Sequence, residues 1–155
     1  GVYQPHRRKF FRKLIRHPLC NLGHVGRNIG HHDWVKPPMT ILEQLQYKFV
    51  LCLEGNDVAT NLKWVMSSNS IAVMPKPKFE TWFMEGTLIP DYHYIEIKDD
   101  YSDLVKKLTY YLHHPEEALA INAHAHEYVA KFKDPKKEDL CALLVLKKYF
   151  ELQEP

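Results

Sequence analysis

Residues 47–66, YKFVLCLEGNDVATNLKWVM, decide the fold of this chain. Residues 50–53 form an uninterrupted apolar run, which is typical of a parallel strand covered on both faces. Gly55 lets the backbone turn after that run, and Asn56 or Asp57 is a suitable cap for a following helix. The stretch therefore predicts a buried strand that leads through a loop into a helix, the kind of unit in which an α/β sheet holds a nucleotide.

Two further strands are expected after this unit. Residues 70–74 (SIAVM) follow the helix at once, and residues 93–97 (HYIEI) precede another helix. This alternation of strands and helices predicts an α/β protein with a parallel sheet and right-handed crossovers. Apolar spacing then predicts helices at 101–113, 115–131 and 135–152, of which at least one should pack back across the domain or onto a second domain.

The segment before the first strand is basic and then irregular. Residues 5–16 are expected to form a helix that carries Arg7, Arg8, Lys9, Arg12, Lys13 and Arg16 and has no acidic residue. Residues 19–40 contain glycines and prolines without periodicity, so we expect a loop that wraps across a neighbouring surface. Short helices are expected at 41–46 and at 79–84, the second of which carries Trp82 and Phe83.

Composition limits the classes of function. A chain of 155 residues with 45% apolar content suits one domain with a sizeable core. No apolar run approaches the roughly 20 residues of a membrane span, and the first residues lack a signal-peptide core, so we expect a soluble chain. Three widely spaced cysteines favour buried thiols in a reducing compartment. A net charge of +2 does not indicate a nucleic-acid partner.

Familiar catalytic and metal-binding motifs are absent from the sequence. There is no GxSxG, Walker or GxGxxG motif, which argues against common serine hydrolases, P-loop nucleotidases and standard dinucleotide sites. The histidine groups at 31–33, 113–114 and 124–126 do not have spacings that converge on one ion, so we expect solvated histidines and no metal. Lys63 is expected at the surface, and Trp82 with Phe83 either stacks on a base or belongs to the core.

A candidate anion site remains. Backbone amides at a helix start attract anions, and we expect such a start from Gly55 to Asn61. Together with the N-terminal arginines, this start would provide the multidentate donors that a diphosphate needs. Glu54 and Asp57 are the only acidic pair near the expected phosphate position, and we expect Asp57 to cap its helix rather than face the ligand. A solvated basic helix that touches an anionic membrane surface is an open alternative.

At residues 47–111 the sequence resembles the C-terminal part of a family of glycosyltransferases. The family comprises lipopolysaccharide-core enzymes (the lipopolysaccharide A protein group), fungal capsule-associated proteins and animal protein O-glucosyltransferases. The resemblance rests on a "YK-strand-G" start, a helix, the stretch SNSIAVM, an aromatic-rich segment, HYIEIK and then DYSDL. The earlier segment VYQPHRR is similar to one that ends in a donor-binding arginine, so the resemblance covers essentially the whole chain.

This resemblance implies a Rossmann-like domain, residues 1–155, that forms the C-terminal, nucleotide-sugar-binding half of a GT-B type enzyme. The N-terminal half, which binds the acceptor and holds the general base, would be absent, and this chain would be inactive alone. Arg7 falls where the family places an arginine on the donor diphosphate. The full donor-binding set that we expect comprises Arg7, Arg8, Gly55, Asn56, Asp57, Val58, Asn61 and Glu80.

The helix start differs from that of the animal members. A serine and an arginine follow the glycine there, whereas Ala59 and Asn61 occupy those positions here, which favours the bacterial branch. The resemblance then implies metal-independent transfer of a hexose from a UDP-hexose to a lipopolysaccharide or lipooligosaccharide core. The expected location is the cytoplasm, with peripheral contact to the inner membrane possible. The alternative function is a non-enzymatic module that docks on a partner or an anionic surface through its basic helix.

Overall fold

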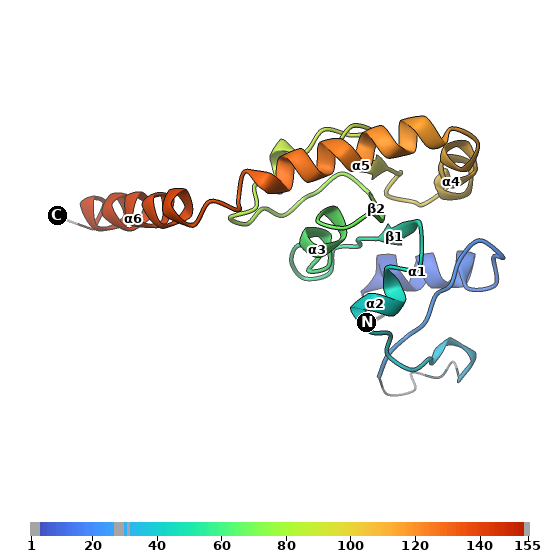
Figure 1. Cartoon of the computed structure of the whole chain (residues 1–155). Coiled ribbons are helices and arrows are strands. Elements are labelled where there is room, and N and C mark those ends of the chain that lie inside the picture. The colour runs from blue at the N-terminus through green and yellow to red at the C-terminus, as the bar shows by residue number, and fades with distance from the viewer. Residues whose placement is uncertain (1–3, 27–29, 31, 154–155) are drawn as a thin grey trace.

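A computed structural model describes residues 4–26, 30 and 32–153 of the chain. The helices of this part are α1 (Pro5–Leu14), α2 (Ile41–Gln44), α3 (Leu62–Met66), α4 (Leu104–His113), α5 (Pro115–Ala130) and α6 (Pro135–Glu151). The strands are β1 (Phe49–Leu51), β2 (Ile71–Met74) and β3 (Ile95–Glu96), and single turns of 3-10 helix occur at His32–Trp34 and Glu85–Thr87. Figure 1 shows α1, α3, α4 and α5 around this short sheet, with α6 apart from it.

The sheet confirms the expected α/β class. Its strand order is β1-β2-β3, and both pairs are parallel, with Val50 opposite Ala72 and Val73 opposite Ile95. All four residues of the central strand β2 are buried, as expected for a parallel strand covered on both faces. Parallel neighbours point their carboxyl ends toward the same edge, where open α/β sheets place their ligands.

The two faces of the sheet support separate apolar clusters. Ala72 and Met74 belong to a cluster with residues of α3 and α5, whereas Ile71 and Val73 belong to a cluster with residues of α1 and α4. This division follows the two-residue period of a strand. The fold is therefore a three-layer α/β arrangement, Rossmann-like with flanking helices, and that expectation is confirmed.

α1 is fixed to the domain by its apolar side. Phe10 and Leu14 are buried, and the Phe10 ring lies edge-on to Tyr101 with 4.9 Å between the ring centroids. Pro5 occupies the start of the helix, where its missing N–H has no cost. Residues after Leu14 leave the helix before Pro18, as the sequence predicted. The N-terminal residues of α1 are thus held at a defined place beside the sheet.

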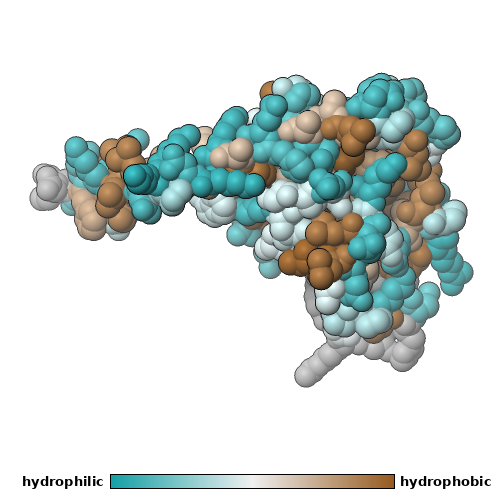
Figure 2. All heavy atoms as spheres, in the orientation of Figure 1, coloured by the Kyte–Doolittle hydropathy of each residue, from teal (hydrophilic) through white to brown (hydrophobic). Residues whose placement is uncertain are grey.

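The last two helices have different environments. α5 packs on α3, β2 and α4, and its Asn122 and His126 side chains bond to the carbonyl oxygen of Ser68. α6 has no buried residue and projects away from the rest of the chain (Figure 1). Figure 2 shows apolar side chains on the surface of α6. The expectation that one terminal helix packs back is therefore met by α5.

Two expected helices are wrong in place or in kind. Residues 79–84 do not form a helix, because Thr81 donates its amide and its hydroxyl to the Glu85 carboxylate, which fixes a turn. The helix expected to start beside Gly55 begins at Leu62 instead. No helix among the described residues is long and apolar enough to cross a membrane.

The thiols only partly follow the expectation of burial. Cys52 is buried, Cys20 is half-buried, and Cys141 on α6 is exposed. Burial raises the pKa of the Cys52 thiol above its ordinary value. A backbone hydrogen bond with Val73 lowers that pKa, but its effect is smaller than that of burial. Cys141 differs because the helix that carries it has no covering layer.

Candidate functional site

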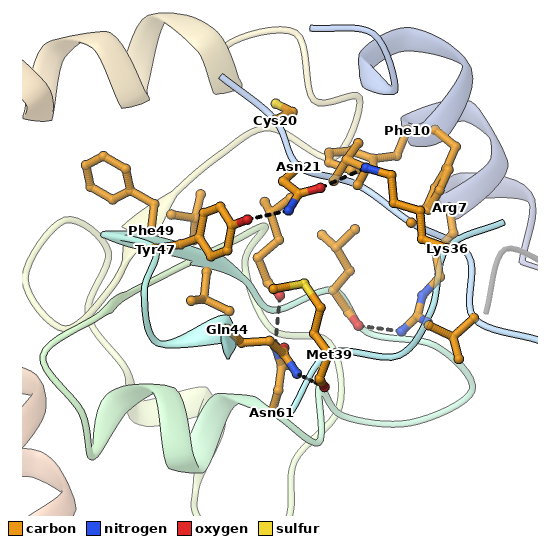
Figure 3. Close-up of a pocket in the computed structure, with 18 of the residues that line it drawn as sticks. Arg7, Phe10, Cys20, Asn21, Lys36, Met39, Gln44, Tyr47, Phe49 and Asn61 are labelled. Carbon is orange, nitrogen blue, oxygen red and sulfur yellow. Dashed lines mark hydrogen bonds between the residues drawn. The ribbon is translucent and has the colours of Figure 1, made fainter. Parts of the chain in front are cut away.

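A cavity of about 1280 Å³ lies beside β1. It is bounded by α1, by parts of the 19–39 loop, by α2 and by the loop that leaves β1, with α4 at one end. Figure 3 shows its side chains converging from these separate segments. Small-molecule sites commonly have volumes of about 300–1,000 Å³, so this cavity is large enough for a nucleotide sugar.

The loop after β1 is held by the first residues of α1. Arg7 donates from Nε to the carbonyl oxygen of Glu54 at 3.0 Å and from Nη2 to that of Leu53 at 2.5 Å. The His6 Nε2 atom also lies 3.0 Å from the Glu54 carbonyl oxygen, and Gln4 donates to the side-chain oxygen of Asn56. These contacts join residues far apart in sequence and place a guanidinium at the carboxyl end of β1.

Gly55 has a different role from the expected turn. Its φ is not in the left-handed region, which Gly26 and Gly30 occupy among the described glycines. A Cβ atom at Gly55 would lie 3.2 Å from Arg7 Nη2 and 3.6 Å from Arg7 Cζ. The missing side chain therefore allows the close approach of the guanidinium.

The expected helix start at Gly55–Asn61 is wrong. Asp57 accepts a bond from the amide of Val58 at 2.8 Å, and the Gly55 amide donates to the carbonyl oxygen of Asp57 at 3.0 Å. Asn61 precedes α3, but its side chain donates to the Leu51 carbonyl at 2.9 Å instead of capping the helix. The predicted cap at Asn56 or Asp57 is therefore wrong as well, and the residues after Gly55 form a hydrogen-bonded loop.

The structure brings together most of the predicted donor-binding residues. Those that line the cavity are Arg7, Gly55, Asn56, Asp57, Val58 and Asn61. Arg8 is exposed and does not line it. Glu80 is also exposed and outside the lining, and its Oε1 atom lies 3.2 Å from the position that a Cβ on Gly86 would take. Helical geometry separates Arg8 from Arg7, since consecutive residues lie about 100° apart around a helix.

Of the acidic pair, Asp57 lines the cavity and Glu54 does not. The Glu54 carboxylate accepts bonds from the amides of Lys78 and Phe79 at 3.0 to 3.2 Å, which ties it to the segment after β2. Asp57 bonds to the neighbouring Val58 amide. The loop after β1 is thus fixed on both sides, by α1 and by residues 78–79.

The 19–40 loop supplies polar residues that the sequence did not single out. Lys36 Nζ donates to Asn21 Oδ1 at 2.8 Å, and the Asn21 amide donates to the Tyr47 hydroxyl (Figure 3). A bridge between His24 and Val35 holds the loop in this position. These residues share no motif or periodicity, so no local signal in the sequence identifies them.

Lys63 is not the simple surface residue that was expected. Its ammonium lies 2.8 Å from the Glu85 carboxylate, and the Glu85 side chain is only 1% exposed. Burial would raise the pKa of Glu85, but hydrogen bonds from Lys63 and Thr81 outweigh it and lower that pKa below its ordinary value. Beside this pair Phe83 is buried in the core, whereas Trp82 remains 64% exposed.

The histidine groups do not form a metal site in the described part of the chain. No group of three or more His, Cys, Asp or Glu residues there could hold a metal ion. The half-buried His126 bonds to a backbone carbonyl, and His113 and His114 bond to carbonyls one turn earlier in their helix. His31 lies outside the described residues.

Comparison with known proteins agrees with this architecture. The O-glucosyltransferase LpsA of Dichelobacter nodosus is 44% identical over 155 residues, which are 100% of this chain and 49% of that protein. Uncharacterized protein 179R of Invertebrate iridescent virus 6 is 30% identical over 95 residues, 57% of this chain and 8% of that protein. No solved structure matches the chain at a significant level.

The chain thus spans about half the length of the LpsA relative that it matches from end to end. Residues 26–154 match the description Glycosyl transferase family 90, so the matched region includes the sheet and the loop that follows β1. The similarity to LpsA also covers α1 and Arg7. On this evidence the chain belongs to Glycosyl transferase family 90.

Proposed function

We propose that this chain is the nucleotide-sugar-binding part of a glycosyltransferase and that it holds the donor in the cavity beside β1. One observation carries the proposal. The Arg7 guanidinium is fixed at the carboxyl end of β1, on the wall of a cavity that most of the expected donor-binding residues line. Family membership agrees with this role.

The donor that we propose is a UDP-hexose. Its diphosphate would lie against Arg7, Gly55 and the side chains of the loop after β1. Two backbone carbonyls set the position of the guanidinium before a ligand arrives, so little reorganisation is needed as negative charge grows on the leaving UDP. The amides of Gly55 and Val58 already bond within the loop, so we assign the main electrostatic role to Arg7.

The acceptor that we propose is a sugar of a lipopolysaccharide or lipooligosaccharide core. The LpsA relative is named an O-glucosyltransferase, which supports transfer to a hydroxyl oxygen. The proposed general base and acceptor site belong to further polypeptide outside these 155 residues, since the chain matches 49% of that relative. We propose cytoplasmic action, and we expect this chain to bind a donor without turning it over.

UDP titration of purified variants tests the role of Arg7. Arg7→Ala should weaken UDP binding by about 1.5–3 kcal/mol, the range for a hydrogen bond to a charged group. Lys13→Ala, an exposed basic residue of the same helix, is the matched control and should change the affinity little. Arg7→Gln removes the charge but keeps an N–H donor for the carbonyl oxygens of Leu53 and Glu54. It therefore separates the effect of the charge from the effect of the contacts that hold the loop.

Equal, small and strongly salt-dependent effects of Arg7→Ala and Lys13→Ala would contradict a specific diphosphate contact. The rival function, a docking module without a donor, requires that UDP does not bind at all. Calorimetry of the wild-type chain with UDP and with uridine therefore decides between the two functions. Affinity for UDP well above that for uridine supports the donor site, and no binding of either overturns it.

We further propose that donor binding needs no divalent ion. Ions usually reach nucleotide diphosphates through one or two carboxylates. The Glu54 carboxylate is occupied by two backbone amides, and Asp57 bonds to Val58. UDP affinity should therefore be the same with magnesium and with EDTA. Affinity that disappears with EDTA and returns with magnesium, but not in Asp57→Asn, would overturn this expectation.

A further inference from the structure

The outward face of α1, together with the turn that follows it, carries basic residues that the donor site does not use. Lys9, Arg12, Lys13 and Arg16 are all exposed, and they follow the i, i+3, i+4, i+7 spacing that places residues on one side of a helix. Phe10 and Leu14 on the other side are buried in the core. The helix and the turn that carries Arg16 therefore present one row of positive charge to solvent.

The charges of this row both support and oppose the helix, since Arg12 and Lys13 lie in its last turn, where the helix dipole favours positive charge. Like charges three or four residues apart on a helix repel each other, and Lys9 stands in that relation to both Arg12 and Lys13. Arg7 and Arg8 also lie in the first turn, where the helix dipole disfavours positive charge, and no acidic residue offsets them there. Helix stability alone therefore does not account for all the basic residues of α1.

Few acidic groups neutralise the row. Asp33 lies 3.7 Å from Arg16, and both side chains are exposed. Asp100 is an exposed acidic group near the row. Hydrogen bonds from Ser102 lower its pKa, and the positive charges of Lys13 and Lys9 lower it further. Most of the positive charge on this face therefore remains available to an external anion.

A hollow lies at the carboxyl end of the row, so the basic surface is concave there. Its volume is about 570 Å³, and its walls are Arg12, Lys13, Ile15, Arg16, His17, Pro18, Asp33 and Trp34. Arginine side chains match the geometry of a phosphate through their planar forks.

We propose that this face docks the protein on an anionic lipid bilayer, with a headgroup phosphate in the hollow at the end of α1. The apolar side of α1 is buried in the core, so it is not available to insert into a bilayer as an interfacial amphipathic helix does. The contact that we propose is therefore electrostatic. Nucleic acid fits less well: the aromatic rings of α1 face inward, where Phe11 packs on Trp34 with 5.5 Å between centroids, and none is offered to bases.

The docking inference does not depend on the proposed donor site. Arg7 and the row lie on different sides of the same ten-residue helix, so loss of one need not affect the other. If both hold, the donor cavity is kept near the bilayer surface, where a lipid-anchored acceptor would lie. UDP titration, run beside the lipid experiment, shows which of the two proposals fails.

Vesicle co-sedimentation tests the inference. The wild-type chain should bind phosphatidylglycerol vesicles but not phosphatidylcholine vesicles, and binding should fall as salt rises. The variant Lys9→Gln/Arg12→Gln/Lys13→Gln/Arg16→Gln should lose affinity by about 600-fold, since each basic residue near a bilayer contributes about fivefold. UDP affinity should stay the same. Its melting temperature should change little, because the loss of repulsive pairs is offset by the loss of the favourable charges in the last turn of α1.

The matched control removes the same charge from another exposed helix. Lys136→Gln/Lys137→Gln/Lys147→Gln/Lys148→Gln changes α6 by four positive charges and should still bind the vesicles. Equal loss in this control would overturn the inference in favour of diffuse attraction. If the α1 variant fails to fold, the double variant Arg12→Gln/Lys13→Gln gives the same comparison with an expected loss of at least tenfold.

Three other outcomes would also overturn docking on a bilayer. Equal binding to both lipids would assign the contact to apolar surface such as α6. Complete displacement by soluble glycerol phosphate would make the hollow a site for a free phosphate. Tighter binding to a single-stranded oligonucleotide than to phosphatidylglycerol would assign the charge row to nucleic acid.

Discussion

Gly55 leaves little room for a side chain next to Arg7 in the candidate site. A Cβ there would meet Arg7 Nη2 at 3.2 Å, which is closer than ordinary van der Waals contact. Gly55→Ala should shift the guanidinium slightly, whereas Gly55→Val should cost about 1–3 kcal/mol of stability, as overpacking does. UDP affinity should fall in the same order. Melting temperature and calorimetric titration measure the two effects.

Gly86→Ala is the matched control for this prediction. A Cβ at Gly86 would also meet its neighbour at 3.2 Å, but that neighbour is the carboxylate end of the exposed Glu80, which can move. The control should melt and bind UDP like the wild-type chain. Wild-type behaviour of Gly55→Val would remove Gly55 and the close approach of Arg7 from the site.

The Lys63–Glu85 pair joins two elements, α3 and the 3-10 turn at Glu85–Thr87. Removal of one partner leaves a buried charge, so Lys63→Met should destabilise the fold by about 3 kcal/mol. Glu85→Gln should cost less because its side-chain oxygen still accepts bonds from Thr81. A double-mutant cycle by chemical denaturation gives the coupling between the two residues. Additive losses would contradict a direct pair.

The same pair predicts the response to acid. The folded state lowers the pKa of Glu85 below its ordinary value of 4.5, so its stabilisation is complete above that value and is lost as pH falls through the folded pKa. The wild-type melting temperature should decrease over that range more than that of Glu85→Gln. Parallel curves for the two proteins would show that another group controls acid unfolding.

At the scale of elements, the sequence predicted those parts of the fold that have strong local signals. Proline and Asp134 mark the start of α6, and the apolar run at β2 marks a strand buried on both faces. The start of α3 was not predictable from local sequence. Asn56 and Asp57 resemble caps, but Gln4, His6 and Arg7 bind the preceding loop and keep it from joining the helix.

The candidate site shows the same limit. Two residues of the site could be predicted from the sequence. Arg7 was predicted from a family resemblance, and Gly55 from its place directly after a strand. The chain of bonds from Lys36 through Asn21 to Tyr47 joins three positions with no shared pattern, so only the folded loop reveals it. Arg8 was named with Arg7 because they are neighbours in sequence, but the turn of the helix separates them.

At the scale of the whole molecule, α6 is the least integrated part of the described chain. Residues 140–146 are apolar and exposed, and a helix that is apolar on all sides is normally buried. A chain that ends at Lys133 should keep its unfolding free energy within about 0.5 kcal/mol, as expected for surface changes. Light scattering should show self-association of the full chain and a monomer for the truncated one.

A large loss of stability in the truncated chain would contradict this picture, because it would mean that α6 packs on the domain in solution. A monomeric full chain would contradict the expected self-association. The helical signal by circular dichroism should fall by the share that α6 contributes, which confirms that the deletion removed a folded helix.

Cys141 lies on this uncovered helix, whereas Cys52 is buried and Cys20 is half-buried. Thiolates are the reactive species, and burial raises the pKa of both Cys52 and Cys20, so these two thiols resist alkylation. Mild alkylation of the folded chain therefore labels Cys141 first. The rate at which Cys141 is alkylated therefore measures how far α6 is covered. If this thiol reacts slowly in a longer form of the protein, other polypeptide covers the helix there.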